Sequence, residues 1–382
     1  MSESLVTHIS LSKSRLLDKM ALKRVLFSFD LEVTARCNFA CRHCYINLPA
    51  GDARAQKREL SLHEIKEIVD EAVSLGALWC LITGGEPLLR DDFFDIYLYL
   101  RQKGLLPSIF TNASLVTADH VKLFKKYPPR DVEVTVYGIT KETYEEVTGK
   151  AGSYSAFRRG LGLLLENGVP VQLKSMALRS NLHEQEEIAR FCRERTRDCF
   201  RFDPFLHLRY DRNPKRNREI KSERLSPAEI VALERADPER RQAIARHCAK
   251  LHSQRLYSPA RNHLFKCGAG TESCSISYDG LFRLCSSLWH PDCIYDLKNG
   301  TLSVAWRDFV SRTRAMCADR VDFLEKCHIC PIIDLCMWCP AHAYLETGDL
   351  DRPVEFFCQV AHARGAEFNH MGAVKRQEVW AK

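Results

Sequence analysis

The sequence lacks any apolar stretch that could cross a membrane. No uninterrupted apolar run in its 382 residues approaches the ~18 residues that a membrane-spanning helix needs. The opening residues 1–24 carry charges throughout and have no apolar core of the kind that a secretory signal peptide contains. We therefore expect a cytoplasmic protein with no membrane partner.

The sequence also lacks a strong excess of charge of one sign. The 56 basic and 49 acidic residues leave a net charge of +7, spread along the chain. The densest basic stretch, residues 209–224, also contains Asp211, Glu219 and Glu223, which favours a solvated linker over a nucleic-acid site. Nucleic acid is therefore not an expected partner, and charge does not decide the function.

Cysteine, by contrast, is abundant. A cytoplasmic protein of this size usually carries far fewer than 17 cysteines. Without a signal peptide, this abundance indicates metal or redox chemistry rather than disulfides. The 45% hydrophobic content is enough for a sizeable core, and the length allows one large domain with a smaller one.

The first half of the chain reads as repeated strand–helix units. Helices between the strands have clear ends, such as the capping box Ser61–Glu64 and the terminal Asn167-Gly168. Six consecutive units predict an α/β fold with a partial (β/α)6 barrel, in which the chemistry sits at the C-terminal ends of the strands. The six β-rich runs are residues 28–34, 78–83, 107–111, 131–137, 170–178 and 199–206.

A cysteine loop follows the first predicted strand. Cys37, Cys41 and Cys44 have the spacing CX3CX2C. Three thiolates on one short loop can ligate three irons of a cubane cluster and leave the fourth iron open for an exogenous ligand.

A glycine-rich motif follows the second predicted strand. In residues 83–87 (TGGEP), paired glycines allow the backbone to approach a ligand closely, and the carboxylate can receive an ammonium group. The next strands end in Thr111-Asn112 and Thr135, and the fifth carries Lys174. These polar side chains are suited to a ribose or a carboxylate, although each also fits an ordinary strand end.

The cysteine loop, the aromatic Tyr45 after it and the GGEP motif one unit later resemble the radical S-adenosylmethionine (SAM) superfamily, over about residues 28–206. The resemblance implies a [4Fe–4S] cluster on the three cysteines, with SAM chelated by its open iron. Reductive cleavage of SAM would yield methionine and a 5′-deoxyadenosyl radical that abstracts a substrate hydrogen. By the same resemblance, Tyr45 lies near the adenine and the methionine amino group is held by Gly84, Gly85 and Glu86. We expect the SAM site to include also Pro87, Asn112, Thr135 and Lys174.

A second set of cysteines lies near the C-terminus. The spacings are CX12GX4C, ending at Cys285, then CX2CX5CX2C, starting at Cys327, and finally the single Cys358. The tight pairs alone would favour zinc. Behind a radical SAM pattern, however, the set resembles the SPASM extension, which usually carries two auxiliary [4Fe–4S] clusters.

The resemblance assigns ligands to both auxiliary clusters. Interleaved ligands would cross-link a domain too small for a large core. The last interval of the cysteine pattern is X2, where the family commonly has X3. If Cys274 is not a ligand, one iron of cluster I is free to bind substrate, and this alternative stays open. Cys293 and Cys317 are the natural substitutes. Cluster I takes Cys267, Cys285 and Cys339, with Cys274 as the fourth ligand, and cluster II takes Cys327, Cys330, Cys336 and Cys358.

These patterns divide the chain into five parts and predict a function. A SPASM-like enzyme would oxidise or cross-link a peptide or protein, because a nearby cluster can accept the substrate electron. We expect an electron donor such as flavodoxin or ferredoxin. Because about 27 residues precede the first strand, we also expect either a separate leader-peptide-binding protein or a substrate that needs none. The parts are an N-terminal extension (1–27), a radical SAM partial barrel (28–208), a helical bridge (209–261), an auxiliary-cluster domain (262–365) and a tail (366–382).

Other functions stay open at this point. A sulfatase-maturing enzyme is disfavoured, because Ser286-Ser287 follows Cys285 where that subclass typically has an aspartate. A radical SAM dehydrogenase of a small molecule such as an aminocyclitol remains an alternative. An RNA-modifying enzyme and a zinc-binding module are weaker ones.

Overall fold

The six predicted strands all occur, in the predicted order, in a computed structural model that describes residues 24–196, 200–253 and 262–368. They pair side by side in parallel, which confirms the expected α/β fold with a parallel sheet. The strands are β1 (Ser28–Thr34), β4 (Trp79–Gly84), β5 (Leu106–Thr111), β6 (Asp131–Thr135), β7 (Val171–Met176) and β8 (Arg201–Asp203).

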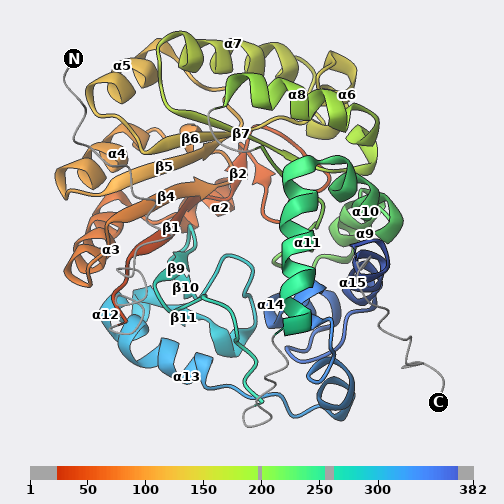
Figure 1. The fold of residues 1–382 in the computed structure, drawn as a ribbon. Helices are drawn as coiled ribbons and strands as arrows, with labels where there is room; N and C mark the ends of the chain where they lie inside the picture. The colour runs from red at the N-terminus through yellow and green to blue at the C-terminus, as the bar shows by residue number, and fades with distance from the viewer. Residues whose placement is uncertain (1–23, 197–199, 254–261, 369–382) are drawn as a thin grey trace, which may run out of the picture.

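Helices cover the outer face of this sheet (Figure 1). The predicted capping box is present at the start of α3, where the Glu64 carboxylate accepts from Ser61 N at 2.7 Å and the Ser61 hydroxyl accepts from Glu64 N at 3.3 Å. Apolar residues from helices and strands, such as Val69, Ile82 and Val134, are fully buried between the layers. The helices are α3 (Leu62–Ser74), α4 (Phe93–Gln102), α5 (Ala118–Lys126), α6 (Lys141–Thr148), α7 (Ser153–Glu166) and α8 (Gln185–Arg195).

The C-terminal region continues the same sheet rather than standing apart from it. Strand β9 (Ser273–Ile276) pairs in parallel with β1, and β10 (Leu281–Arg283) and β11 (Tyr295–Asp296) follow it in antiparallel pairs. The strand order is therefore β11-β10-β9-β1-β4-β5-β6-β7-β8. Figure 1 shows the rest of this region in the lower part of the picture, with its first helix, α12 (Leu302–Val304), beside α3. It also contains α13 (Val310–Arg314), α14 (Pro340–Thr347) and α15 (Glu355–Phe368).

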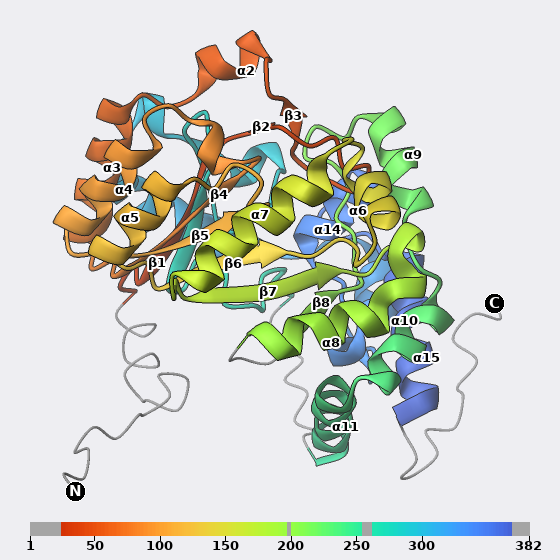
Figure 2. The same cartoon turned by 90° about the horizontal axis from the view of Figure 1, so that it is seen from above.

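Three helices connect the two halves. They are α9 (Pro214–Ser222), α10 (Pro227–Ala236) and α11 (Pro238–Ser253), within the predicted bridge. Helix α10 packs against α15, where Arg364 donates to the fully buried Glu234 at 2.8 Å (Nε to Oε2) (Figure 2). None of the described helices is both long and apolar enough to cross a membrane.

The ordered structure extends beyond two of the predicted domain boundaries, the one at residue 28 and the one at residue 365. Leu26 is fully buried, and Trp306 Nε1 donates to the carbonyl of Arg24 at 2.7 Å, so packing begins before residue 28. Helix α15 runs to Phe368, past the predicted boundary at 365. Residues 1–23, 197–199, 254–261 and 369–382 of the predicted parts lie outside the described residues, and residue 199 is the first of the predicted strand 199–206.

Candidate radical SAM site

The three motif cysteines lie together at the C-terminal end of β1. Cys37 is in the short strand β2 (Arg36–Cys37), which pairs with β3 (Leu48–Pro49) and so closes residues 38–47 into one loop. The three thiols influence one another electrostatically, and Cys44 N donates to the carbonyl of Cys41 at 3.3 Å. The structure thus places the loop at the strand end where the barrel architecture predicts it.

The donor set suits an iron–sulfur cluster. Burial raises the pKa of the Cys37 thiol to about 12 and that of Cys41 well above its ordinary value. A bare thiolate is therefore unstable in this loop, and a coordinated metal cation is the species that would hold these sulfurs deprotonated. Three such cysteines on one loop fit a [4Fe–4S] cluster with an open iron.

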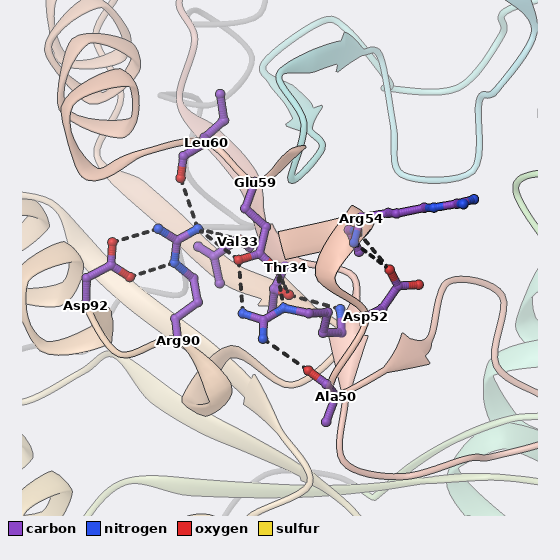
Figure 3. A network of polar contacts seen from close by, with 11 residues as sticks. Val33, Thr34, Ala50, Asp52, Arg54, Glu59, Leu60, Arg90 and Asp92 are labelled. Carbon is purple, nitrogen blue, oxygen red and sulfur yellow. Dashed lines mark hydrogen bonds and ion pairs between the residues drawn. The ribbon is translucent and has the colours of Figure 1, made fainter. Parts of the chain in front are cut away.

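An arginine network supports the N-terminal side of this loop (Figure 3). Arg36 Nε donates to Glu59 Oε1 at 2.7 Å, and Arg90 Nη1 lies 3.8 Å from Glu59 Oε2. All three side chains are at most 10% exposed. No sequence motif pointed to this network, although an arginine stands directly before the first motif cysteine. The guanidiniums also donate to the carbonyls of Val33, Ala50 and Leu60 and to the carboxylate of Asp92.

The paired glycines of the GGEP motif pack against the backbone that leads into the cysteine loop. Gly85 N donates to Thr34 O at 2.6 Å. Gly84 has φ +125°, and a Cβ there would lie 2.1 Å from Thr34 O. A Cβ on Gly85 would lie 2.2 Å from Arg36 O. Glycine is therefore required at both positions for this contact.

Glu86 connects the ends of two strands. Its carboxylate is fully buried and accepts hydrogen bonds from Leu88 N at 3.1 Å, Thr111 Oγ1 at 2.7 Å and Asn112 N at 2.8 Å. Burial outweighs these bonds and raises its pKa to about 7. Much of the acceptor capacity expected for a ligand ammonium group is thus already engaged within the protein.

Asn112 and Tyr45 lie close to the cysteine loop. Asn112 Nδ2 is 3.9 Å from Cys37 Sγ and donates to Asn38 Oδ1 at 2.9 Å. Tyr45 is near Cys44 and Glu32, and its hydroxyl has a raised pKa because it is buried. Both residues are placed to contact a group bound at the loop.

The remaining predicted SAM contacts are more varied in position. Pro87 is buried at the first position of a short 3-10 turn after Glu86. Thr135 ends β6 and is level with Lys174 of β7. Lys174 Nζ is 2.9 Å from Glu133 Oε2 and lies over the ring of Phe110, and burial lowers its pKa to about 8. Lys174 therefore already has a carboxylate partner within the sheet.

The C-terminal cysteines form two groups. Cys285 interacts electrostatically with Cys339 and Cys267, and these three cysteines belong to the set that the resemblance assigns to cluster I. Cys327, Cys330, Cys336 and Cys358 interact with one another in the same way, and they are the set that the resemblance assigns to cluster II. In the described ranges, no three His, Cys, Asp or Glu side chains converge closely enough to hold a single metal ion. The thiolates of a cubane stand farther apart, at its separate irons.

Cys274 is not brought to the other members of the predicted cluster I set. It lies in β9, level with Phe29 of β1, and is only 1% exposed. Its electrostatic neighbours are Asp30 and Cys80, in the core of the sheet. Cys293 is the buried cysteine near Cys285, and its thiol contacts Met316 Sδ at 3.7 Å.

A partly buried pair of histidines joins the barrel to the auxiliary cysteines, and no sequence motif pointed to it. His342 Nε2 is 3.0 Å from His207 Nδ1, and Ser287 Oγ is 2.8 Å from the same nitrogen. His342 N also donates to Cys339 Sγ at 3.4 Å. The His207 ring lies 6.3 Å from the Tyr45 ring, centroid to centroid, so the pair lies between the predicted SAM cluster and the predicted cluster I.

Comparisons with known proteins agree with this site. Residues 31–192 match the sequence profile of the radical SAM superfamily. The AdoMet-dependent heme synthase of Nitratidesulfovibrio vulgaris is 24% identical, over 83% of this chain and 88% of the relative. The mycofactocin maturase MftC of Mycolicibacterium smegmatis is 28% identical, over 41% of this chain and 39% of the relative.

The fold also matches solved structures along most of its length. Streptococcus suis SuiB bound to S-adenosylmethionine superposes with a TM-score of 0.64 and 14% identity, covering 94% of this chain and 83% of SuiB. SuiB bound to its precursor peptide SuiA superposes similarly, with a TM-score of 0.63 and 13% identity, covering 94% of this chain and 84% of SuiB. The strand order, the cysteine loop at the end of β1 and the profile match together show that residues 31–192 form a radical SAM domain.

Proposed function

We propose that this protein is a cytoplasmic radical SAM enzyme that oxidises or cross-links a peptide or protein substrate. The observation that carries the proposal is the arrangement of cysteines. One group lies at the end of β1, and two further groups, around Cys285 and Cys327, lie in the region that continues the barrel sheet. An oxidation started by a radical needs a place for the remaining substrate electron, and such groups suit electron-accepting clusters.

The residues of the chain have distinct roles in this proposal. Cys37, Cys41 and Cys44 hold a [4Fe–4S] cluster, and Asn112 and Tyr45 border the space beside it. When bound there, the cluster and SAM supply the one-electron cleavage of SAM that produces a hydrogen-abstracting radical. Cys267, Cys285 and Cys339 hold one auxiliary cluster, and Cys327, Cys330, Cys336 and Cys358 hold the other. A flavodoxin or ferredoxin would reduce the first cluster, and a separate protein would bind a leader peptide.

The choice of a peptide substrate is supported by proteins that share the fold. SuiB was solved with a precursor peptide and superposes on 94% of this chain. MftC, a maturase, matches 41% of this chain. The histidine pair and Ser287 place polar groups between the SAM site and Cys285, where a substrate segment would meet both.

A second candidate has a specific observation in its favour. The heme synthase of N. vulgaris matches 83% of this chain by sequence, about twice the share that MftC matches. An iron porphyrin is therefore the alternative substrate class. It would use the same SAM site and the same electron exit.

One experiment compares the two candidates. Anaerobically reconstituted enzyme would be incubated with SAM and reductant, together with either the peptide encoded nearest to its gene or an iron porphyrin with carboxylate side chains. Mass spectrometry would follow 5′-deoxyadenosine and any change in substrate mass. The Cys37→Ala/Cys41→Ala/Cys44→Ala variant, which lacks the SAM cluster, is the control.

We expect a mass change in the peptide that depends on SAM and is absent from the control. A modified porphyrin with an unchanged peptide would favour the second candidate. 5′-Deoxyadenosine formation without a change in either substrate would contradict both.

A further inference from the structure

The C-terminal side of the cysteine loop is held by a segment more than 160 residues away in the chain. Arg216 Nη2 donates to the carbonyl of Cys41 at 3.0 Å. Arg209 Nη1 donates to the carbonyl of Asn47 at 3.0 Å, and Tyr210 N donates to the carbonyl of Tyr45 at 3.2 Å. Residues 209–216 therefore contact the loop from its second motif cysteine to its end.

Asn47 connects these contacts to the cysteines. Its Oδ1 accepts from Arg216 Nη2 at 3.1 Å and from Arg209 Nη1 at 3.3 Å. On the other side, Asn47 N donates to Cys44 Sγ and Asn47 Nδ2 to the Cys41 carbonyl, each at 3.4 Å. Two guanidiniums thus fix a residue that is hydrogen-bonded to both Cys41 and Cys44.

The same arginines place positive charge beside the predicted cluster. Arg209 is buried, whereas its partner Asp211 is 37% exposed, so the cationic end of this pair lies toward the loop. Arg216, paired with Glu219, acts electrostatically on both Cys41 and His43. A nearby cation stabilises the more negative, reduced form of a cluster, and charge near a cluster is one determinant of its potential.

We propose that Arg216 is a positioning residue for the SAM cluster, which holds Cys41 and Cys44 through Asn47 and raises the reduction potential of the cluster bound there. The effect on the reduction potential rests on the proposed function, because it needs the cluster. The hydrogen bonds from Arg216 to the loop do not depend on the metal. It goes beyond the motif ligands, because Arg216 belongs to helix α9 of the bridge and not to the barrel.

The test compares three variants of the full chain. Arg216→Gln removes the charge. Arg216→Lys keeps the charge but lacks the planar fork in which Nη1 donates to Glu219 while Nη2 donates to Cys41 O and Asn47 Oδ1. Arg218→Gln is the matched control at an exposed site of the same helix. Hydrogen–deuterium exchange of residues 41–47 reports the hold on the loop. A redox titration of the electron paramagnetic resonance signal that changes on adding SAM reports the potential.

We expect exchange in residues 41–47 to be faster by about tenfold or more in both Arg216 variants, because charge-assisted hydrogen bonds are lost. The potential should fall in Arg216→Gln, fall less in Arg216→Lys and stay unchanged in Arg218→Gln. Wild-type exchange and potential in Arg216→Gln would overturn the proposal. If the wild-type chain showed no SAM-sensitive cluster, the proposed function would fail, and the exchange comparison would still decide whether Arg216 holds the loop.

Discussion

Gly84 lets the GGEP backbone pack closely against the backbone that leads into the cysteine loop, because it has no Cβ. Its φ of +125° and the 2.1 Å approach of a Cβ to Thr34 O make Gly84→Ala both strained and overpacked. Gly104→Ala is a control with positive φ (+81°) and open space around the Cβ. Urea unfolding should show a loss of about 1 kcal/mol for the control and of roughly 2–4 kcal/mol for Gly84→Ala.

The iron content of the same variants separates a local from a global effect. If the GGEP contact positions the loop, Gly84→Ala should also bind less iron after reconstitution, whereas Gly104→Ala should match the wild type. Equal losses of stability in the two variants would mean that glycine is needed at position 84 because of backbone strain alone, and not because of contact with the loop.

Glu86 makes the stability of the iron-free protein depend on pH. Its pKa is about 7 in the folded protein, above the ordinary value of 4.5, because the carboxylate is buried. The folded state therefore binds this proton more tightly than the unfolded state, and the stabilisation is present below pH 4.5 and lost as the pH rises through 7. The stability of the wild type relative to Glu86→Gln should fall between about pH 5 and pH 7. Thermal unfolding across this range measures it, and a pH-independent difference would contradict the burial argument.

The sequence predicted the chemistry of these residues better than their contacts. The spacing of Cys37, Cys41 and Cys44 and the order of the motifs point to the site, because a short loop after a strand brings neighbouring residues together. Arg216 and Asn47 could not be found in this way. Arg216 donates to the Cys41 carbonyl, 175 residues away, and to Asn47 Oδ1, 169 residues away, and such long-range bonds leave no spacing or periodicity in the sequence.

At the scale of elements, β1 is the strand that joins the two halves of the molecule. The six barrel strands were predictable because each is a short β-rich run between helix signals. The pairing of β9 with β1 was not, because a strand of four residues carries little pattern and its partner lies about 245 residues earlier. Cys274 illustrates the consequence, because the same pairing places it in the sheet core and away from Cys285.

A buried ion pair fixes this junction. Arg283 of β10 donates to Glu32 of β1 at 2.6 Å, and both side chains are 0% exposed. Arg283 also donates to Ser286 O at 2.7 Å and lies over the ring of Trp289, so it holds the loop that follows Cys285. Glu32 Oε1 and Arg283 Nε have no hydrogen-bond partner among the described residues. Removing one member of the pair would therefore leave the other as a buried charge without compensation.

Arg283→Met should destabilise the protein by about 3–5 kcal/mol, because it leaves the Glu32 carboxylate buried and uncompensated. The double variant Glu32→Gln/Arg283→Met should recover a large part of that loss, since no charge remains buried. Lys122→Met is the control, because its pair with Asp119 is more than 70% exposed on both sides and should change stability by no more than about 0.5 kcal/mol. Urea unfolding measures all three, and a double variant as unstable as the single one would refute the argument.

At the scale of the whole molecule, the distribution of cysteines separates two steps of the proposed reaction. The SAM cysteines lie at the end of β1, whereas Cys327 and Cys330 lie in the C-terminal region and neighbour Cys358. Cleavage of SAM should need only the first group. Completion of the reaction should need the second as well, because the substrate electron must leave and the substrate must be positioned.

The Cys327→Ala/Cys330→Ala variant tests this separation, with Cys274→Ala as its matched control from the sheet core. Reconstituted wild-type protein should contain about twelve irons, from three cubanes of four irons each, and the double variant about eight. The double variant should still release 5′-deoxyadenosine in the presence of reductant but yield little or no modified product.

The Cys274→Ala control should keep the iron content and the product yield of the wild type, because the Cys274 thiol lies beside Asp30 and Cys80. If the auxiliary cysteines only staple the fold, the double variant will instead aggregate or lose both activities together. If the double variant folds, lacks the iron of cluster II and still forms as much modified product as the wild type, the electron-acceptor role is excluded.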